Sequence, residues 1–397
     1  MNLEKMQNVL SMQQIPPAFS DIYPRIADTW QDHAASILSD DYITKTLDDC
    51  YALASYRTEI LQSAQRVRQN PAMCLLVCLL EQWLREGGRP TSAVYTPPVG
   101  TDPAFDFLHL FPAIPTMPDS VAYLRQRKVP EDIIAASMQE YDSTVANRKL
   151  STGKPGLTAG ILSWLCCVIN NELIHIGCLK YNPPCKCLSG VRVYEHQDGT
   201  IAVLADNVQV HASGRVLGSV GHTDPEGSFL AEIQTTESAV IGYPVVKGFI
   251  QKEPVTLPKA QWSLKLSPDD LLARVHIPRG GVFNRETIES SYQRAREIFV
   301  NCYPDRPLKG FHCCTWLLAD ELQTILKPTS NILAFQEPYI KIPTQTNGRE
   351  AFSFVFPGCR TDAASIPTWP ENTNLQRSIK QLYLDGGYLH EGTGFFF

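Results

Sequence analysis

The hydrophobic pattern of the chain changes its period once, close to residue 177. Before this point apolar residues recur three and four positions apart, as in DDYITKTLDDCYALASYRTEILQSAQRV and NPAMCLLVCLLEQWLREGG, which is the spacing of an amphipathic α-helix. From Gly177 to about Val275 they alternate in period two, as in GVRVYEHQDGTIAVLADNVQVHASGRVLGSVG, where the Asp-Gly pair is a strong hairpin signal. A helical part therefore precedes a part with several antiparallel strands.

The elements after the strand-rich section follow a mixed order. A strand at LLARVHI leads through Pro-Arg-Gly-Gly into a helix from about Arg285 to Val300, with Asn284 as its N-cap. There follow a strand at GFHCCTW, a short helix before Pro328, a strand around NILAFQEPYIKI, a helix near NTNLQRSIKQLYLDGG and an aromatic tail. This order is typical of an α/β arrangement.

The length of 397 residues exceeds the roughly 250 to 300 residues at which a single hydrophobic core stops growing. We therefore expect an α+β protein of two domains. Residues 1–155 form the helical domain, and residues 156–397 form the mixed α/β domain, which includes the β-rich section 177–275. The Pro-rich segment 89–120 is expected to be a connecting surface loop, with a lid over a site as the alternative.

The charge balance and the N-terminal residues exclude several classes of protein. A formal net charge of −6 and a pI near 5.9 leave no excess of cationic side chains for a nucleic-acid backbone. The start MNLEKMQNVLSMQQIPP lacks the pattern of a signal peptide, and no window approaches about 18 apolar residues in a row. We expect a cytoplasmic protein that binds neither nucleic acid nor membrane.

The twelve cysteines are interpreted mainly as small core residues, since free Cys is often buried. Cys185 and Cys187, near Cys178, form a cluster with CxC spacing, for which a zinc site is the alternative. Because no second knuckle follows, no metal is expected.

Six short sequence motifs follow one another along the chain. They are NELIHIGCLKY, IGYPVVKG, VHIPRGGVFNRETIESSYQRAREIF, GFHCCTWLLADEL, SNILAFQ and TNLQRSI, the last followed by Gly386 and Gly387. These strings resemble those of the bacterial acyltransferase-domain proteins, which have an N-acyltransferase N-terminal domain and a GNAT-like C-terminal domain. The resemblance covers the chain from about Leu157 onward. It implies a GNAT-like fold that uses acyl-CoA as co-substrate.

The resemblance also implies where coenzyme A binds. In the GNAT pattern a loop between a central strand and a helix holds the pyrophosphate on its backbone N–H groups, so Gly280 and Gly281 are the expected site, with Arg279 adding a charge-assisted contact. The chain departs from the usual Q/R-x-x-G-x-G/A pattern of this loop, and Glu286 would compete with a phosphate. A plain Gly-Gly turn is the alternative.

Acyl transfer from a thioester to an amine also needs a base and a proton donor. His276, in the strand before the glycine loop, and His312, in the next strand, would border one cleft if these strands are neighbours. Glu172, before the strand-like LIHIG, is a third candidate base. For each of them the alternative is an ordinary packed residue.

Cys313 and Cys314 allow a covalent acyl-cysteine hypothesis, but nothing in the strand lowers the pKa of a thiol there. Trp316 and the tail Phe395–Phe397 are expected to pack in the core rather than to line an acyl pocket.

The sequence therefore predicts transfer of an acyl group from acyl-CoA to a small-molecule amine or hydroxyl acceptor, by direct attack in a ternary complex. One alternative is a non-enzymatic small-ligand or carbohydrate-binding protein with a degenerate GNAT-like domain, which the absence of a V-shaped opening between the two central strands would favour. Another is a hydrolase that uses Cys314 or Ser330, although the chain lacks a G-x-S-x-G elbow. The acceptor, the acyl length and the oligomeric state stay open.

Overall fold

The computed structural model describes residues 1–91 and 104–397. The chain divides into two compact units, Met1–His175 and Ile176–Phe397. Residue 155, where we expected the boundary, lies before the last helix of the first unit. Residues 92–103 of the segment considered as a connecting loop or a lid fall outside the described residues, and its later part contains a short helix at Ala104–Phe107 and the start of another at Met117.

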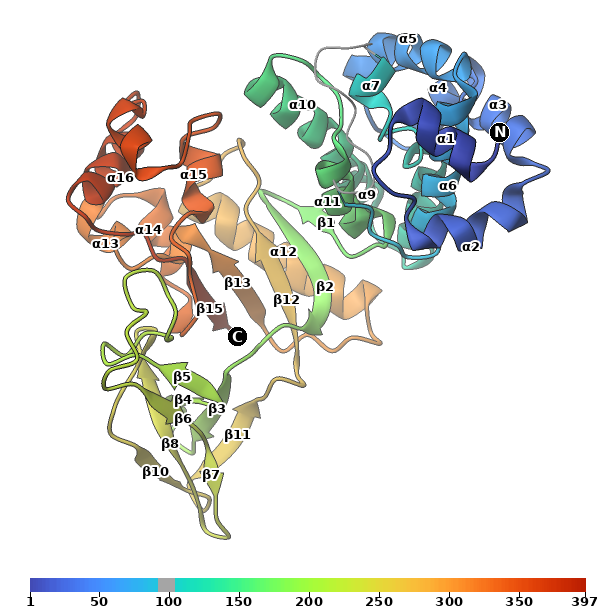
Figure 1. Ribbon diagram of the computed structural model, residues 1–397. Coiled ribbons are helices and arrows are strands. Elements are labelled where there is room, and N and C mark those ends of the chain that lie inside the picture. The colour runs from blue at the N-terminus through green and yellow to red at the C-terminus, as the bar shows by residue number, and fades with distance from the viewer. Residues whose placement is uncertain (92–103) are drawn as a thin grey trace. The chain divides into compact units, whose positions relative to one another are not determined.

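The first unit is helical, as the 3.6-residue periodicity predicts (Figure 1). Its helices are α1 (Leu3–Leu10), α2 (Pro17–Ile26), α3 (Trp30–Ile37), α4 (Asp40–Asp49), α5 (Arg57–Arg68), α6 (Pro71–Arg85), α7 (Ala104–Phe107), α8 (Met117–Gln126), α9 (Glu131–Met138), α10 (Glu140–Thr152) and α11 (Ala159–Ile169).

Helix α6 is the centre of the first unit and packs against α1, α2, α3 and α5. The Asn70 side chain accepts hydrogen bonds from the N–H groups of Ala72 and Met73, and Pro71 occupies the first helical position, where its missing N–H costs nothing. The helix is apolar nearly all round and is buried accordingly. No helix among the described residues is both long enough and apolar enough to cross a membrane.

The second unit is built on a sheet with the strand order β2 (Leu179–Lys186), β12 (Leu271–His276), β13 (Phe311–Thr315), β15 (Gly392–Phe396) and β14 (Ile340–Ile342). A short strand, β1 (Ile174–Ile176), spans the boundary between the two units. β12 and β13 are parallel, and parallel neighbours need a crossover connection. Helix α12 (Arg285–Cys302) provides it (Figure 1).

The β-rich section lies in the sequence between β2 and β12 and forms a second sheet. Its strands are β3 (Val191–His196), β4 (Ile201–Ala205), β7 (Gln234–Thr235), β8 (Ala239–Val246), β9 (Phe249–Ile250), β10 (Val255–Pro258) and β11 (Trp262–Leu266), and a separate ribbon joins β5 (Val208–Val210) to β6 (Phe229–Ala231). The hairpin predicted at Asp198-Gly199 connects β3 to β4, with Gly199 at φ +88°. The predicted fold class, a helical domain followed by a mixed α/β domain with a β-rich section, is confirmed.

Short helices complete the second unit. They are α13 (Leu322–Ile325), α14 (Asn331–Gln336), α15 (Glu350–Val355) and α16 (Asn374–Leu384). The strand predicted across NILAFQEPYIKI is wrong in its first half, because the Ser330 hydroxyl caps a helix at Ile332 and only Ile340–Ile342 is extended. A short apolar run does not distinguish these two states.

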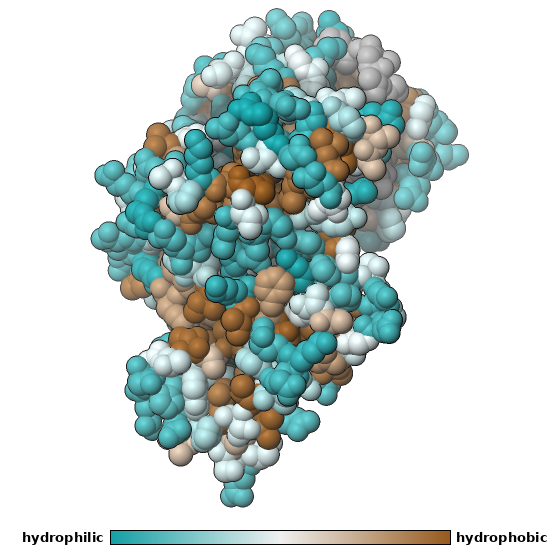
Figure 2. All heavy atoms as spheres, turned by 90° about the vertical axis from the view of Figure 1, so that its left-hand side faces the viewer, coloured by the Kyte–Doolittle hydropathy of each residue, from teal (hydrophilic) through white to brown (hydrophobic). Residues whose placement is uncertain are grey.

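The surface carries no unusual apolar feature on the face shown in Figure 2. Hydrophobic side chains occur there in separate groups among hydrophilic ones. Scattered exposed apolar residues of this kind are normal for a folded protein.

Candidate active site

The two central strands of the second unit separate at their carboxyl ends. The parallel ladder consists of the pairs Ala273–Phe311 and Arg274–His312, although β12 continues to His276 and β13 to Thr315. Beyond the last pair, β12 stays with β2 through Val275 and His276, and β13 stays with β15. The ladder between β12 and β13 therefore ends before either strand does, which is the pattern of strands that splay apart, and we call this end of the strand pair the V-shaped opening.

A thiol binds one of the carbonyl groups at this opening. The Sγ of Cys313 donates a hydrogen bond to the carbonyl oxygen of Val275 at 3.3 Å. Cys313 is fully buried, and burial raises the pKa of its thiol well above the ordinary value. The thiol therefore serves as a donor for a buried carbonyl, which needs a partner, and it is not a nucleophile.

The two faces of the sheet differ at the opening because side chains alternate along a strand. On one face Phe311 packs against Tyr181 and Tyr292, with ring centroids 5.8 and 5.3 Å apart. The other face carries side chains with acid–base or nucleophilic chemistry, namely Asn182, Arg274, His276, His312 and Cys314. Arg274 and Cys314 are exposed, so this face is accessible.

The structure brings His276 and His312 together on this face, as the neighbouring strands predict. The Nε2 of His276 lies 2.7 Å from Oδ1 of Asn182. Burial, followed by the charges of Arg274 and Lys180, lowers the pKa of His276 to about 4. Its imidazole is therefore neutral at pH 7.

His312 is the more enclosed of the two, at 4% exposure. Its Nδ1 has no hydrogen-bond partner among the described residues. Burial, then Arg274 and His276, lowers the pKa of His312 to about 4. A neutral, incompletely bonded imidazole therefore borders the opening.

The glycine loop follows β12 directly and precedes α12. Gly280 and Gly281 both have φ +82°, with open space where a Cβ would lie. Asn284 caps α12 by accepting from the Thr287 N–H at 2.9 Å, and the Thr287 hydroxyl oxygen accepts from the Asn284 N–H. The loop is therefore open, glycine-dependent and followed by a well-defined helix N-terminus.

Arg279 contacts another element of the unit. Its guanidinium donates to the carbonyl oxygens of Ser353 and Phe354, at 3.0 and 3.1 Å. These carbonyls belong to the last turn of α15, where the helix dipole favours a cation. Arg279 thus connects the glycine loop to α15.

Glu172, the third predicted base, belongs to the first unit. It follows α11 and forms an ion pair with Arg89.

Sequence reasoning did not find Glu350, the first residue of α15. Its Oε2 accepts a hydrogen bond from the Trp316 N–H at 2.8 Å, directly after the end of β13. Loss of surrounding water, and then repulsion from Glu391, raise the pKa of Glu350. Its charge in turn contributes to the raised pKa of Cys314. No local motif marks Glu350, because its place depends on a contact across 34 residues.

Glu391 has a different environment. Its carboxylate accepts from the N–H groups of Gly348, Arg349 and Glu350, at 3.3, 3.1 and 2.9 Å. These groups form the N-terminus of α15, which favours an anion. The two neighbouring carboxylates therefore differ in how their charge is stabilised.

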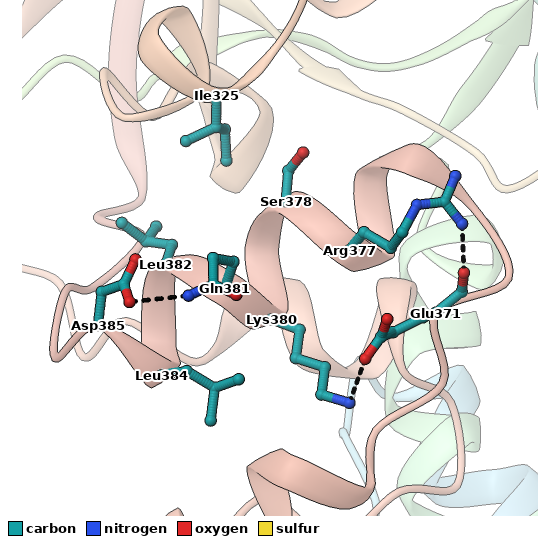
Figure 3. A pocket seen from close by; sticks show the side chains of 9 residues that line it. All are labelled: Ile325, Glu371, Arg377, Ser378, Lys380, Gln381, Leu382, Leu384 and Asp385. Carbon is teal, nitrogen blue, oxygen red and sulfur yellow. Dashed lines mark hydrogen bonds and ion pairs between the residues drawn. The ribbon is translucent and has the colours of Figure 1, made fainter.

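A hollow of about 510 Å³ lies along α16 (Figure 3). Figure 3 shows its charged and polar side chains engaged with nearby groups: Lys380 with Glu371 at 2.6 Å, Gln381 with Asp385 at 2.8 Å, and Arg377 with the Glu371 carbonyl at 2.6 Å. This pairing leaves the opening between β12 and β13 as the stronger candidate. Across residues 1–91 and 104–397, no group of three His, Cys, Asp or Glu side chains is placed to hold a metal ion.

Comparison with known proteins agrees with this architecture. A family model described as the GNAT-like C-terminal domain matches residues 173–396. An acyltransferase in complex with decanoyl-CoA has 16% sequence identity and a TM-score of 0.58, over 90% of this chain and 87% of that chain. A mutant acyltransferase with octanoyl-CoA, and an acyltransferase with decanoyl-CoA and teicoplanin, each have 16% identity and a TM-score of 0.62 over 100% of this chain and 99% of theirs. No curated protein matches the chain.

Proposed function

The chain belongs to the family with a GNAT-like C-terminal domain, and we propose that it is an acyltransferase that uses acyl-CoA. The acceptor is a small molecule with an amine or hydroxyl group. The observation that carries this proposal is the V-shaped opening between β12 and β13, with the glycine loop directly after β12. A thioester donor bound at this loop would have its reacting group beside the accessible polar face.

The solved structures of similar fold support the choice of donor. They hold decanoyl-CoA, octanoyl-CoA or coenzyme A, and some also hold teicoplanin or its acylated form. These complexes favour an acyl chain of medium length and an acceptor that can be larger than a simple amine. The fold likeness extends over the whole chain.

Coenzyme A would be held mainly by the backbone of the glycine loop. Positive φ at Gly280 and Gly281 and the absence of side chains there allow N–H groups to approach a diphosphate closely. Arg279 would contribute in one of two ways. It either exchanges the carbonyls of α15 for phosphate oxygens, or it holds α15 in place while the backbone binds the phosphates.

The chemistry is a direct displacement. The acceptor nitrogen or oxygen forms a bond to the thioester carbonyl carbon, the carbon–sulfur bond breaks, and the sulfur leaves as a thiolate. One proton must leave the acceptor, and one must reach the thiolate. Among the predicted groups, His276 and His312 remain candidates for these transfers at the opening, and Glu172 remains a candidate in the first unit.

Both alternative functions receive less support. A degenerate domain would have no need of the separated strands that the structure contains. For a hydrolase, loss of water around the sulfur atom raises the pKa of the Cys314 thiol, although part of this side chain is exposed. The Ser330 hydroxyl is used as a helix cap. We further propose that the protein acts in the bacterial cytoplasm, in keeping with its composition.

The test is an acyl-transfer assay on the purified protein. Octanoyl-CoA and decanoyl-CoA are incubated with a panel of simple amines, amino sugars, alcohols and teicoplanin, and products are identified by mass spectrometry. We expect an acylated acceptor together with stoichiometric release of free coenzyme A. Absence of any acylated product and of any enzyme-dependent thiol release would contradict the proposal.

A further inference from the structure

The opening contains two histidines whose protonation is strongly disfavoured. Both have a pKa of about 4, and Arg274 opposes a positive charge on each of them. A catalytic base works best when its pKa lies near the operating pH. Accepting a proton from an amine would therefore be unfavourable for either imidazole.

We propose that Glu350 is the general base of the acyl transfer, an inference that rests on the proposed function. Its carboxylate is anchored at the carboxyl end of β13, where Oε2 accepts from the Trp316 N–H at 2.8 Å. Glu350 is exposed and influences Cys314, whose side chain lies on the accessible face of the opening. An anchored and accessible carboxylate thus stands at the edge where the two strands part.

The neighbouring carboxylate prepares Glu350 for this role. Three N–H groups donate to Glu391, whereas Glu350 receives the Trp316 N–H and faces the negative charge of Glu391. Loss of surrounding water, followed by the charge of Glu391, raises the pKa of Glu350 although the Trp316 N–H opposes this rise, and its carboxylate becomes a stronger base. Two carboxylates in different environments are a recurring way to divide acid–base roles.

Helix α15 links this base to the proposed coenzyme site. Glu391 binds the first N–H groups of the helix, and Arg279 of the glycine loop binds its last carbonyls. The position of Glu350 is therefore fixed from both ends of a six-residue helix.

The proton balance of the step is simple. As the acceptor forms its bond to the carbonyl carbon, its proton passes to the Glu350 carboxylate while the carbon–sulfur bond breaks. The proton then returns from the carboxyl group to the coenzyme A thiolate or to water, and the carboxylate is restored.

The decisive variant is Glu350→Gln, because the amide oxygen of Gln can still accept from the Trp316 N–H. The probe is octanoyl-CoA with 2-aminoethanol, and with water alone as a second acceptor, followed by thiol release. We expect kcat/KM for 2-aminoethanol to fall by about 100-fold or more, with unchanged octanoyl-CoA affinity. In the reaction with water, which has no ammonium form, the acidic limb of the pH profile should disappear. Added formate should restore part of the rate. Glu237→Gln, an exposed carboxylate of the β-rich section, should match the parent.

The outcomes separate the two proposals. A parent protein without acyl-CoA-dependent turnover on any acceptor of the panel above contradicts the proposed function itself. An active parent whose Glu350→Gln variant keeps both its rate and its acidic limb overturns the assignment of Glu350 alone. If that variant does not fold, the pH profiles of His276→Gln and His312→Gln decide: the acidic limb persists in both if Glu350 is the base, and its loss in either one overturns the inference.

Discussion

At the scale of single residues, the opening is defined by side chains that stay neutral although they can titrate. Burial disfavours the charged forms of His276, His312 and Cys313. Arg274 is the exposed cation among them. The opening is thus suited to an uncharged thioester and to the neutral form of an amine.

Burial of His312 predicts a pH-dependent stability. Its pKa is about 4 in the folded protein and about 6.5 in an unfolded chain. The unfolded state therefore binds more protons between these values, and the free energy of unfolding falls as the pH drops from 6.5 toward 4. We expect a contribution of about 3 kcal/mol from this residue, fully present above pH 6.5.

The measurement is urea unfolding at several pH values for the parent and for His312→Gln. The variant should lose less stability than the parent between pH 6.5 and pH 4. Parallel pH dependences in the two proteins would show that His312 is not held neutral.

At the scale of elements, the N-terminus of α12 contributes to the stability of the fold and, in the proposed function, to the binding of coenzyme A. Asn284→Ala removes the side-chain acceptor for the Thr287 N–H and leaves the backbone half of the capping box in place, which typically costs about 1 kcal/mol. We also expect weaker octanoyl-CoA binding, because the N–H groups at the helix start would no longer be fixed beside the glycine loop.

The matched control is Thr373→Ala, which removes the equivalent side-chain acceptor, for the Gln376 N–H, from the capping box of α16. Chemical denaturation should show a similar loss in both variants, and calorimetric titration with octanoyl-CoA should show weaker binding in Asn284→Ala alone. Equal octanoyl-CoA affinities of the two variants would show that the Asn284 cap does not contribute to ligand binding.

The sequence predicted elements well where their pattern was long or carried a terminal signal. The helix from Arg285, with Asn284 as its cap, and the hairpin at Asp198-Gly199 are present as expected. The strand across NILAFQ was wrong, because six apolar-rich residues fit either state and the Ser330 cap decided for a helix. Local patterns therefore fixed the types of most elements, although not of the shortest ones.

Sequence reasoning predicted only part of the candidate site. Because His276 and His312 lie on strands joined by a single helix, their proximity followed from the crossover rule for parallel strands. Glu350 and Glu391 are separated by 41 residues, and their contact depends on how α15 and β15 pack. No periodicity or spacing in one sequence encodes such a contact.

At the scale of the whole molecule, the family match and the local geometry of the opening concern the same part of the chain. The GNAT-like match covers residues 173–396, and within it the β-rich section occupies the sequence between β2 and β12. The opening and the glycine loop nevertheless arise from consecutive elements, β12, α12 and β13. The central claim is therefore that acyl-CoA binds at this loop.

Calorimetric titration of octanoyl-CoA into the parent, Gly281→Ala and Gly199→Ala tests this claim most directly. Both glycines have positive φ and open space around them, so alanine imposes a similar backbone strain of about 1–2 kcal/mol at each site. Only Gly281 lies at the proposed phosphate contact. We predict binding by the parent, at least a 10-fold loss of affinity in Gly281→Ala, and parent-like affinity in Gly199→Ala. No binding by the parent, or equal affinity in all three proteins, would contradict the account.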